Sequence, residues 1–477
     1  MAMKGYILIG LLVLVASFAN TINAKPITPS YGISTLNRTS FPKGFTFGTA
    51  SASYQYEGAA FEDGKGKSMW DYYSHKYPEK IADGSNGDVA SDQYNRFKED
   101  FGILKDMNAD AYRFEISWPR LIPTGKISDG VNQKGIDHYN QVIDELLAKG
   151  LTPYVTIFHW QIPVALDHKY GGFLSQSIVE DFKDYAELCF KEFGDRVKHW
   201  TTLNEPHMYT NGGYAAGVLA PFRSTEPYTV AHNLLLAHAH AVNVYKTKYQ
   251  AKQKGAIGIT VDLDWMVPYS ESDEDRAAAL RAIDFRFGWF MDPLTKGRYP
   301  LSMRTHVGEN RLPKFNETES KLVKGSYNFI GLNYYTANYV ADAPEDKSLN
   351  KSYLTDALVH KTGIYDLLNY TKTEYGDPEI YITENGINEL NNASLPLKEA
   401  LEDTHRIDYH YRHLQQVHKA IGMGVKVKAY FAWSFLDTFE WFSGFTIRFG
   451  IHYIDYENEL KTYPKLSAQW FKNFLKK

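Results

Sequence analysis

Short apolar runs alternate with amphipathic stretches along most of the chain. Runs of roughly 4–8 apolar or β-branched residues predict buried strands, and apolar residues spaced three or four apart predict helices with one buried face. The strand-like runs are Phe45–Thr49, Ala111–Ile116, Thr152–Phe158, His199–Leu203, Ile257–Leu263, Phe329–Asn333, Glu379–Thr383 and Val427–Trp433. The clearest helical stretches are Gln133–Lys149, Ser175–Phe193, Thr229–Lys248, Glu274–Trp289 and Leu397–Ile421.

This alternation predicts one α/β domain, a closed (β/α)8 TIM barrel. Strands that are separated by helices pair in parallel, and eight such units favour closure into a barrel. Such barrels can exceed ~400 residues, so a chain of 477 residues requires no second domain. We expect the barrel domain to span residues 41–477, with its active site at the C-terminal face of the strands.

The N-terminus has the pattern of a signal peptide over residues 1–24, followed by a leader over residues 25–40. Lys4 supplies the positive charge, Tyr6 to Ala19 is apolar, and Ala24 offers a small residue for cleavage. The apolar run is too short to span a membrane comfortably. We therefore expect entry into the secretory pathway, with secretion to the extracellular space or apoplast or delivery to a vacuole.

Sequons for N-glycosylation fit the same route. Candidates are Asn37, Asn316, Asn350 and Asn392, whereas the fifth sequon, at Asn369, lies in a helical pattern and is the least suitable. The single cysteine, Cys189, excludes an intramolecular disulfide and is expected to be a small buried residue of a helix.

Charge and composition exclude several kinds of partner. The net charge is −4 and no basic block stands out, so neither nucleic acid nor an anionic membrane is expected as a partner. The 16 histidines form no paired metal-ligand spacing, and no glycine-rich phosphate loop precedes a helix, so no metal or cofactor is expected. Aromatic residues make up 15% of the chain, which suits a protein that packs against sugar rings.

Two strand-like runs end in a carboxylate. Glu205 stands in an Asn-Glu-Pro sequence and Glu384 in a Thr-Glu-Asn-Gly sequence. One such Glu is often part of a structural ion pair. Two of the same form suggest a facing pair of carboxyl groups, which is what glycoside hydrolysis requires.

Other polar or aromatic residues occupy equivalent positions at or near strand ends, where a barrel would gather them on one face. They are Gln55, Arg113, His159, Asn204, Asn333, Tyr335 and Trp433. Taken singly, each has an ordinary structural interpretation: His159 as a satisfied core histidine, Arg113 as a salt bridge, and Trp433 as core.

The segments Thr-Leu-Asn-Glu-Pro and Ile-Thr-Glu-Asn-Gly resemble the two signature segments of the family 1 glycoside hydrolases, the β-glucosidase family. The resemblance runs from Phe45 to about Phe474, in the style of the plant members. It implies a retaining β-glycosidase that removes terminal β-D-glucosyl residues from small-molecule O-glucosides through a covalent glycosyl-enzyme. Glu205 would be the acid/base and Glu384 the nucleophile.

The resemblance also implies roles for the surrounding residues. Arg113 and Tyr335 would support Glu384, and Asn333 would belong to the substrate site. The sugar hydroxyls and ring would meet Gln55, His159, Asn204, Trp433, Glu440, Trp441 and Phe449. Glu440 implies a neutral hexopyranoside rather than a 6-phosphosugar, and a Glu at position 205 implies O-glycosides rather than thioglucosides.

The chain departs from the family pattern at three places. The loop Pro221–Thr225 is short and has no cysteine, and Gln161 and Val164 replace an Asp and a Gln. The stretch between Tyr335 and Glu384 is short and lacks the tryptophan that normally supports the aglycone. Two alternatives therefore stay open: a transglycosidase that uses the same site, and a catalytically impaired sugar-binding relative.

Overall fold

The computed structural model describes residues 36–308, 310–343, 353–357, 359–360 and 367–476. The expected signal peptide, most of the leader, the sequon at Asn350 and residues 363–366 of the short stretch before Glu384 lie outside them. Within the described ranges, no helix is both long and apolar enough to cross a membrane.

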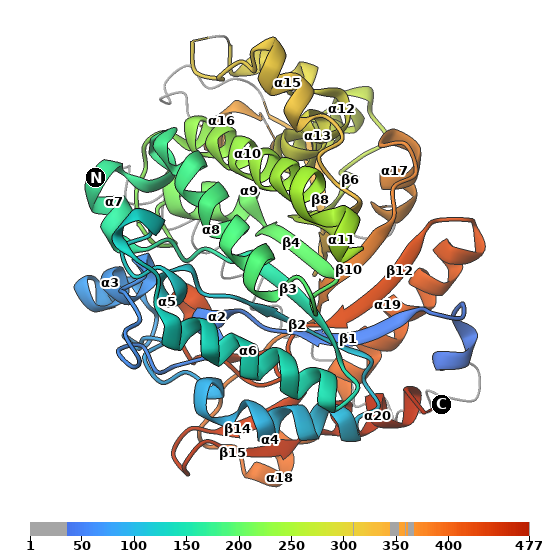
Figure 1. The fold of residues 1–477 in the computed structure, drawn as a ribbon. Coiled ribbons are helices and arrows are strands. Elements are labelled where there is room, and N and C mark those ends of the chain that lie inside the picture. Colours follow the sequence, from blue (N-terminus) through green and yellow to red (C-terminus); the bar gives the residue numbers. More distant parts are fainter. Residues whose placement is uncertain (1–35, 309, 344–352, 358, 361–366, 477) are drawn as a thin grey trace.

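Eight parallel strands of the described chain close into a barrel, as predicted (Figure 1). Their order around the barrel is their order along the chain, and the last strand pairs with the first. The strands are β1 (Thr46–Ala50), β2 (Ala111–Glu115), β3 (Thr152–Phe158), β4 (His199–Asn204), β5 (Ala256–Asp262), β7 (Phe329–Asn333), β10 (Ile380–Asn385) and β12 (Val427–Ala432).

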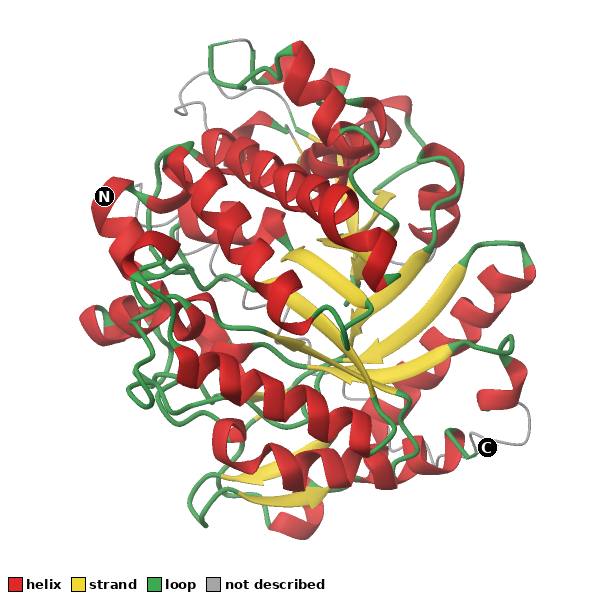
Figure 2. Cartoon of the chain, in the orientation of Figure 1, coloured by secondary structure: helices red, strands yellow, loops and turns green. Residues whose placement is uncertain are grey.

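Helices surround these strands (Figure 2). The α-helices are α2 (Ser53–Tyr56), α3 (Met69–Lys76), α4 (Gln93–Asp106), α5 (Trp118–Leu121), α6 (Gln133–Ala148), α7 (Val164–Tyr170), α8 (Ser177–Phe193), α9 (Pro206–Thr210), α10 (Pro227–Val244), α11 (Gln250–Gln253), α12 (Asp273–Ile283), α13 (Trp289–Lys296), α14 (Leu301–His306), α15 (Glu317–Val323), α16 (Tyr353–Asp356), α17 (Leu367–Glu374), α18 (Leu397–Ala400), α19 (Thr404–Gly422) and α20 (Leu466–Phe474).

Shorter elements decorate the loops. The 3-10 and π turns are η1 (Arg38–Ser40), η2 (Pro78–Lys80), η3 (Ile127–Asp129), η4 (Gly172–Leu174), η5 (Asn211–Ala215), η6 (Tyr245–Tyr249), η7 (Asp284–Gly288) and η8 (Trp441–Ser443). The small strands are β6 (Trp265–Pro268), β8 (Ala337–Asp342), β9 (Val359–His360), β11 (Glu389–Leu390), β13 (Ile447–Arg448), β14 (His452–Asp455) and β15 (Lys461–Pro464).

The prediction of one helix over Leu397–Ile421 is wrong. The chain instead breaks between α18 and α19 at the buried residue Asp403. Its carboxylate accepts hydrogen bonds from Arg406 Nη1 at 2.5 Å and from the backbone N–H of Ser467 at 2.8 Å. Asp403 thus stands at the start of α19, held by a local pair with Arg406 and by a tertiary contact with Ser467, of which the periodicity of the flanking residues carries no sign.

Aromatic side chains fill the N-terminal half of the barrel. Tyr154 of β3 contacts Tyr381 of β10 at 5.9 Å between ring centroids, although the two strands are not neighbours, so both rings lie in the barrel interior. Phe329 stacks on Tyr381 at 4.3 Å, and His199 stacks on Tyr154 at 4.0 Å. Because this layer is packed, polar groups that enter the interior gather at the opposite, C-terminal end.

Cys189 lies on α8 and is fully buried, as predicted. Burial raises the pKa of its thiol, so the residue behaves as a small apolar side chain.

Candidate active site

Glu384 lies at the C-terminal end of β10 and is 3% exposed. Arg113 reaches it across the barrel from β2 and donates from Nη1 to Oε1 at 2.6 Å. The Tyr335 hydroxyl donates to the other carboxylate oxygen, Oε2, at 2.5 Å. A buried carboxylate needs a paired charge and hydrogen-bond donors, and these two side chains supply them.

Glu205 follows the last residue of β4 and adopts a left-handed backbone conformation, with φ of 44°. This conformation costs roughly 1–3 kcal/mol for a residue with a side chain, and such residues cluster at functional sites. Its backbone N–H donates to the Thr260 carbonyl at 2.9 Å, and Pro206 then begins α9. The turn is therefore held from both sides, and it fixes where the Glu205 carboxyl points.

A hydrogen-bonded network joins the two carboxyl groups. Asn333 Nδ2 donates to Glu205 Oε1 at 2.6 Å and to Asn204 Oδ1 at 3.1 Å. The same Asn204 oxygen accepts from Arg113 Nη2 at 2.6 Å, while Nη1 of that guanidinium holds Glu384. In addition, Asn333 pairs with Glu384 in the register of β7 and β10. Both glutamates thus belong to one site.

The two carboxyl groups stand in different electrostatic surroundings. Burial, and then the negative charges of Asp262 and Glu384, raise the pKa of Glu205 well above its usual range. The Arg113 guanidinium lies against Glu384, whereas no cationic side chain of the described residues forms an ion pair with Glu205. These surroundings favour the protonated form of Glu205, whereas Glu384 has a paired cation.

Three buried side chains near this pair each carry a polar atom that finds no hydrogen-bond partner among the described residues. These atoms are Gln55 Oε1, His159 Nδ1 and Glu440 Oε1. Gln55 and Glu440 are held together, since Gln55 Nε2 donates to Glu440 Oε2 at 3.3 Å and to the Phe439 carbonyl at 2.8 Å. Because buried polar atoms favour a hydrogen-bond partner, these three atoms beside the carboxyl pair are available to a polar ligand.

His159 adds a donor to this set. Burial and the nearby Arg113 charge lower the pKa of His159 well below its usual range, so the ring is neutral. Asn204 Nδ2 lies 3.0 Å from His159 Nε2, and the Asn204 oxygen is already an acceptor for Arg113 and Asn333. Nε2 is therefore the acceptor, and Nδ1 carries the proton.

Aromatic rings border the same region. Trp433 follows β12, and its ring lies 6.2 Å from that of His159. Trp441 lies 5.7 Å from His159 and 4.7 Å from Trp160, while Phe449 contacts Tyr335 at 5.9 Å. All these expected site residues therefore meet at one end of the barrel.

The glycine after Glu384 permits a close approach of two strand ends. A Cβ atom at Gly386 would lie 1.8 Å from the Trp433 carbonyl oxygen, which no side chain could tolerate. The absence of a side chain at Gly386 lets the end of β10, which carries Glu384, pack against Trp433, the residue that follows β12. Asn385 has a structural role, since its Oδ1 accepts from Tyr430 at 2.6 Å.

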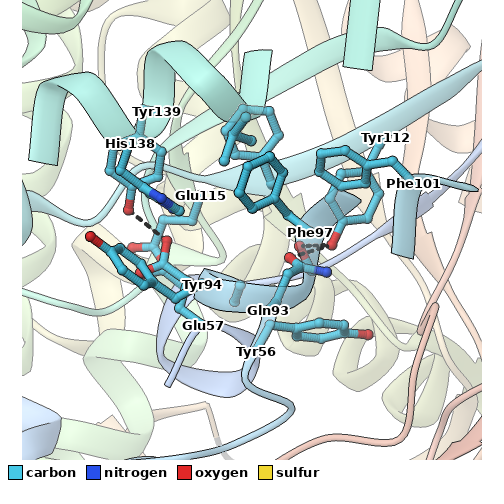
Figure 3. A pocket seen from close by; sticks show the side chains of 15 residues that line it. Tyr56, Glu57, Gln93, Tyr94, Phe97, Phe101, Tyr112, Glu115, His138 and Tyr139 are labelled. Atoms are coloured by element: carbon cyan, nitrogen blue, oxygen red, sulfur yellow. Dashed lines mark hydrogen bonds between the residues drawn. The ribbon is translucent and has the colours of Figure 1, made fainter. Parts of the chain in front are cut away.

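A small cavity lies beside the site, between β2, α4 and α6 (Figure 3). Its space of about 20 Å³ for a water-sized molecule is enough for one water and far too small for a sugar. Tyr139 donates to Glu57 at 2.6 Å, and Tyr112 donates to Gln93 at 2.9 Å along its walls. Glu115 also lines it, which places this carboxyl between the cavity and the active site.

Sequence reasoning missed a charged group next to Glu205. Asp262 is the last residue of β5, and its Oδ2 accepts from Arg286 Nε at 2.8 Å and lies 3.3 Å from His207 Nδ1. The run Ile257–Leu263 predicts an apolar strand. Asp262 lies near the end of that run, as the other polar candidates lie near the ends of theirs, and this position could have identified it. Arg286 and His207 lie on η7 and α9, and no local pattern marks them.

In the described part of the chain, no group of three or more His, Cys, Asp or Glu side chains is arranged to hold a metal ion.

A (β/α)8 barrel with two buried carboxyl groups at the ends of its strands defines the class of glycoside hydrolases. The chain belongs to glycosyl hydrolase family 1, whose model matches residues 37–477. Members of this family are retaining glycosidases.

Relatives within the family are similar over almost the whole chain. Beta-glucosidase 24 of Oryza sativa subsp. japonica is 54% identical over 92% of this chain and 94% of that protein. An isoflavonoid 7-O-beta-apiosyl-glucoside beta-glycosidase of Dalbergia nigrescens is 51% identical over 100% of this chain and 92% of that protein. The crystal structure of a rice β-glucosidase, 47% identical, superposes with a TM-score of 0.90 over 93% of this chain and 100% of that one.

Proposed function

We propose that this protein is a β-glucosidase that releases terminal β-D-glucosyl residues from O-glucosides, with Glu384 as nucleophile and Glu205 as acid/base. The observation that carries the proposal is the buried pair itself: a carboxylate held by Arg113 and Tyr335, and a second carboxyl, kept protonated, in the same network. The names of its relatives in family 1 support the choice of a β-glucoside as substrate.

In the first step, a Glu384 oxygen attacks the anomeric carbon as the glycosidic C–O bond breaks. The proton of Glu205 passes to the departing oxygen, and the products are the free alcohol and a glucosyl ester of Glu384. Arg113 and Tyr335 hold the Glu384 carboxylate in place, so little motion is needed before attack.

In the second step, water attacks the anomeric carbon and Glu205 takes its proton, while Glu384 leaves as a carboxylate. Esterification has removed the Glu384 charge, which is one of the causes of the raised pKa of Glu205, so that pKa falls and the group can act as a base. One pair of carboxyls thereby serves both steps, and the anomeric configuration is retained.

The unpartnered atoms of the site are the proposed contacts for the glucose hydroxyls. Gln55 Oε1 and Glu440 Oε1 would accept hydrogen bonds, and His159 Nδ1 would donate one. Asn204 has one Nδ2 hydrogen left for the 2-hydroxyl, since its other polar positions already have partners. Trp433 would form the floor, with Trp441 and Phe449 at the rim and Asn333 positioning Glu205.

Turnover of a chromogenic aryl β-glucoside, followed by NMR of the first-formed sugar, tests this proposal. We expect β-glucose as the first product, and we expect a carboxyl separation of ~5–5.5 Å, the retaining value, in a complex with substrate. Release of α-glucose would contradict it. The same assay distinguishes the two alternative functions. A transglycosidase would yield mainly glycosides of added alcohols, and a catalytically impaired relative would bind glucose without turnover.

Secretory targeting and N-glycosylation remain part of the proposal. Asn392 is exposed, and its Oδ1 accepts from the Ser394 hydroxyl at 2.7 Å; Asn37 holds the Thr39 hydroxyl in the same way at 2.7 Å. Asn316 is exposed but caps α15 with its oxygen. A mass shift on enzymatic removal of N-glycans from protein isolated from the secretory pathway would test these sites.

A further inference from the structure

A cluster of buried charges adjoins Glu205 and has no part in the mechanism above. Asp262, at the end of β5, is 3% exposed. Its Oδ2 faces Arg286 Nε at 2.8 Å and His207 Nδ1 at 3.3 Å, and its Oδ1 has no hydrogen-bond partner among the described residues. Arg286 also donates from Nη1 to Asp264, so it is shared between two carboxylates.

The backbone places this cluster against the acid/base. Asp262 pairs in register with Asn333, whose amide donates to the Glu205 carboxyl at 2.6 Å. The N–H of Glu205 is bonded to the Thr260 carbonyl on the same strand as Asp262. His207, two residues after Glu205, contacts Asp262 directly. The two carboxyl groups are thus fixed on adjacent strand ends, with low-dielectric protein around both.

We propose that Asp262 is a positioning residue that keeps a permanent negative charge beside Glu205, so that Glu205 stays protonated for the first step and is a stronger base in the second. This inference rests on the proposed role of Glu205. It goes beyond that role because it assigns a function to Asp262, which contacts neither the proposed sugar site nor the nucleophile.

The charges that face Glu205 come from several elements. Glu384 of β10 and Asp262 of β5 are negative, Arg286 of η7 is positive, and Tyr335 and Asn333 are neutral donors. Burial is the largest cause of the raised pKa of Glu205; the charges of Asp262 and Glu384 raise it further, whereas Arg286 lowers it.

Asp262 itself stays ionised. Burial alone would raise the pKa of Asp262, but Arg286 and His207 outweigh burial and lower it to about 2. The Arg286 guanidinium thus has two effects: it fixes the charge of Asp262 and offsets part of that charge at Glu205.

The consequence concerns the reaction cycle. The charge of Glu384 disappears when the glucosyl ester forms and returns when water releases the sugar. The charge of Asp262 does not change in either step, because no bond to it forms or breaks. The pKa of Glu205 therefore falls in the glucosyl-enzyme, but Asp262 limits that fall and leaves Glu205 a better base for water.

The test is the pH dependence of Asp262→Asn against the parent enzyme. We expect the alkaline limb of kcat/KM, which reports Glu205 as acid in the free enzyme, to move to lower pH by about one unit. For a substrate whose second step limits turnover, the acid limb of kcat should move in the same direction. If the substitution only disturbed packing, it would lower the rates without shifting the alkaline limb of kcat/KM and the acid limb of kcat in the same direction.

Asp264→Asn is the matched control. It removes the other carboxylate partner of Arg286 by the same chemical change, but Asp264 has no direct part in the Glu205 network. We expect less than half of the shift seen for Asp262→Asn. If Asp262→Asn does not fold, Asp262→Asn combined with Arg286→Gln removes the pair as a neutral unit. The limbs should still move to lower pH, by a smaller amount, because the Asp262 effect is the larger of the two.

Failure of this inference is separable from failure of the proposed function. If Glu205→Gln abolishes the alkaline limb but neither Asp262 variant moves it downward, Asp262 has no such role and the function stands. If Glu205→Gln leaves the limb in place, the assignment of Glu205 fails, and the inference fails with it.

Discussion

Gln161 donates a hydrogen bond from Nε2 to Glu115 Oε2 at 3.1 Å, inside the barrel wall and next to the sugar site. The family resemblance implies an Asp at position 161; in this chain Gln161 instead contacts a buried carboxyl from β2. Glu115 also accepts from the Ser53 N–H at 2.9 Å and from the His159 N–H at 2.8 Å. It thereby ties the start of α2, which carries Gln55, to the end of β3.

Glu115→Gln is expected to damage glucose binding more than chemistry. The Glu115 carboxyl receives donors from Ser53, His159 and Gln161, and an amide would turn an N–H₂ group toward one of them. An unsatisfied buried donor costs about 1–3 kcal/mol, so KM should rise about tenfold with a smaller change in kcat. The double variant Glu115→Gln with Gln161→Glu moves the carboxyl across the hydrogen bond and should recover part of the loss. An unchanged KM for the single variant, measured with an aryl β-glucoside, would show that Glu115 does not position the site.

The two catalytic glutamates should give different losses. Glu384→Gln removes the nucleophile and should abolish hydrolysis of every β-glucoside. Glu205→Gln should retain more activity on aryl glucosides with good leaving groups, because these need little protonation.

Azide distinguishes the roles further. It attacks the glucosyl-enzyme without a general base, so it should accelerate the Glu205→Gln variant and yield β-glucosyl azide, whereas Glu384→Gln should not respond. If the Glu205→Gln variant gains no rate and forms no such product, the roles assigned to the pair are incorrect.

The fold follows from the sequence because it depends on local rules, whereas the site follows partly from those rules and partly from the resemblance of the two signature segments to family 1. The eight strands are apolar runs, and the residues that matter stand where those runs end. Pairings across the barrel join strands far apart in the sequence. The pairing of Arg113 with Glu384 is implied by the family resemblance, whereas that of Tyr154 with Tyr381 is specified only by the closed barrel.

The failures have the same origin. Asp403 breaks a helix because of contacts with Arg406 and Ser467, and Asp262 acts on Glu205 because β4 and β5 are adjacent. Gln161 is a departure from the family pattern that puts the local geometry near His159 in question, and its partner Glu115 lies on another strand. Substitutions of this kind can be interpreted only after the strands have been assembled.

Asp100, on α4 and away from the site, should make stability depend on pH. Burial raises the pKa of Asp100 to about 7, from 3.8 as an ordinary Asp, and Gln93 donates to it at 3.1 Å. Between these two values the folded state binds a proton that the unfolded state has lost. The contribution of Asp100 to the free energy of unfolding is therefore highest below pH 3.8 and decreases as pH rises toward 7.

Asp100→Asn should remove that loss. The Asn variant should gain thermal stability relative to the parent as pH increases from 4 to 8, by up to about 4 kcal/mol, since one pKa unit corresponds to 1.36 kcal/mol. Asp106→Asn, on the exposed side of the same helix, is the control and should show no such trend. A difference between parent and Asp100→Asn that stays constant from pH 4 to 8, measured by calorimetry, would contradict the buried proton.

The leaving-group side should discriminate poorly among aglycones. The stretch between Tyr335 and Glu384 contains no tryptophan, and aromatic stacking contributes about 0.5–1.5 kcal/mol beyond area burial, so its loss should weaken preference for bulky aromatic aglycones by about tenfold at most. The residues of the proposed glucose site, Gln55, His159 and Glu440, are all present and buried, so a cationic glucose mimic should still inhibit. A series of kcat/KM values across small and large aglycones tests the first expectation. A thousandfold preference for one bulky aromatic aglycone would mean that another residue has replaced the platform, and failure of the mimic to bind would mean that the glucose site itself is damaged.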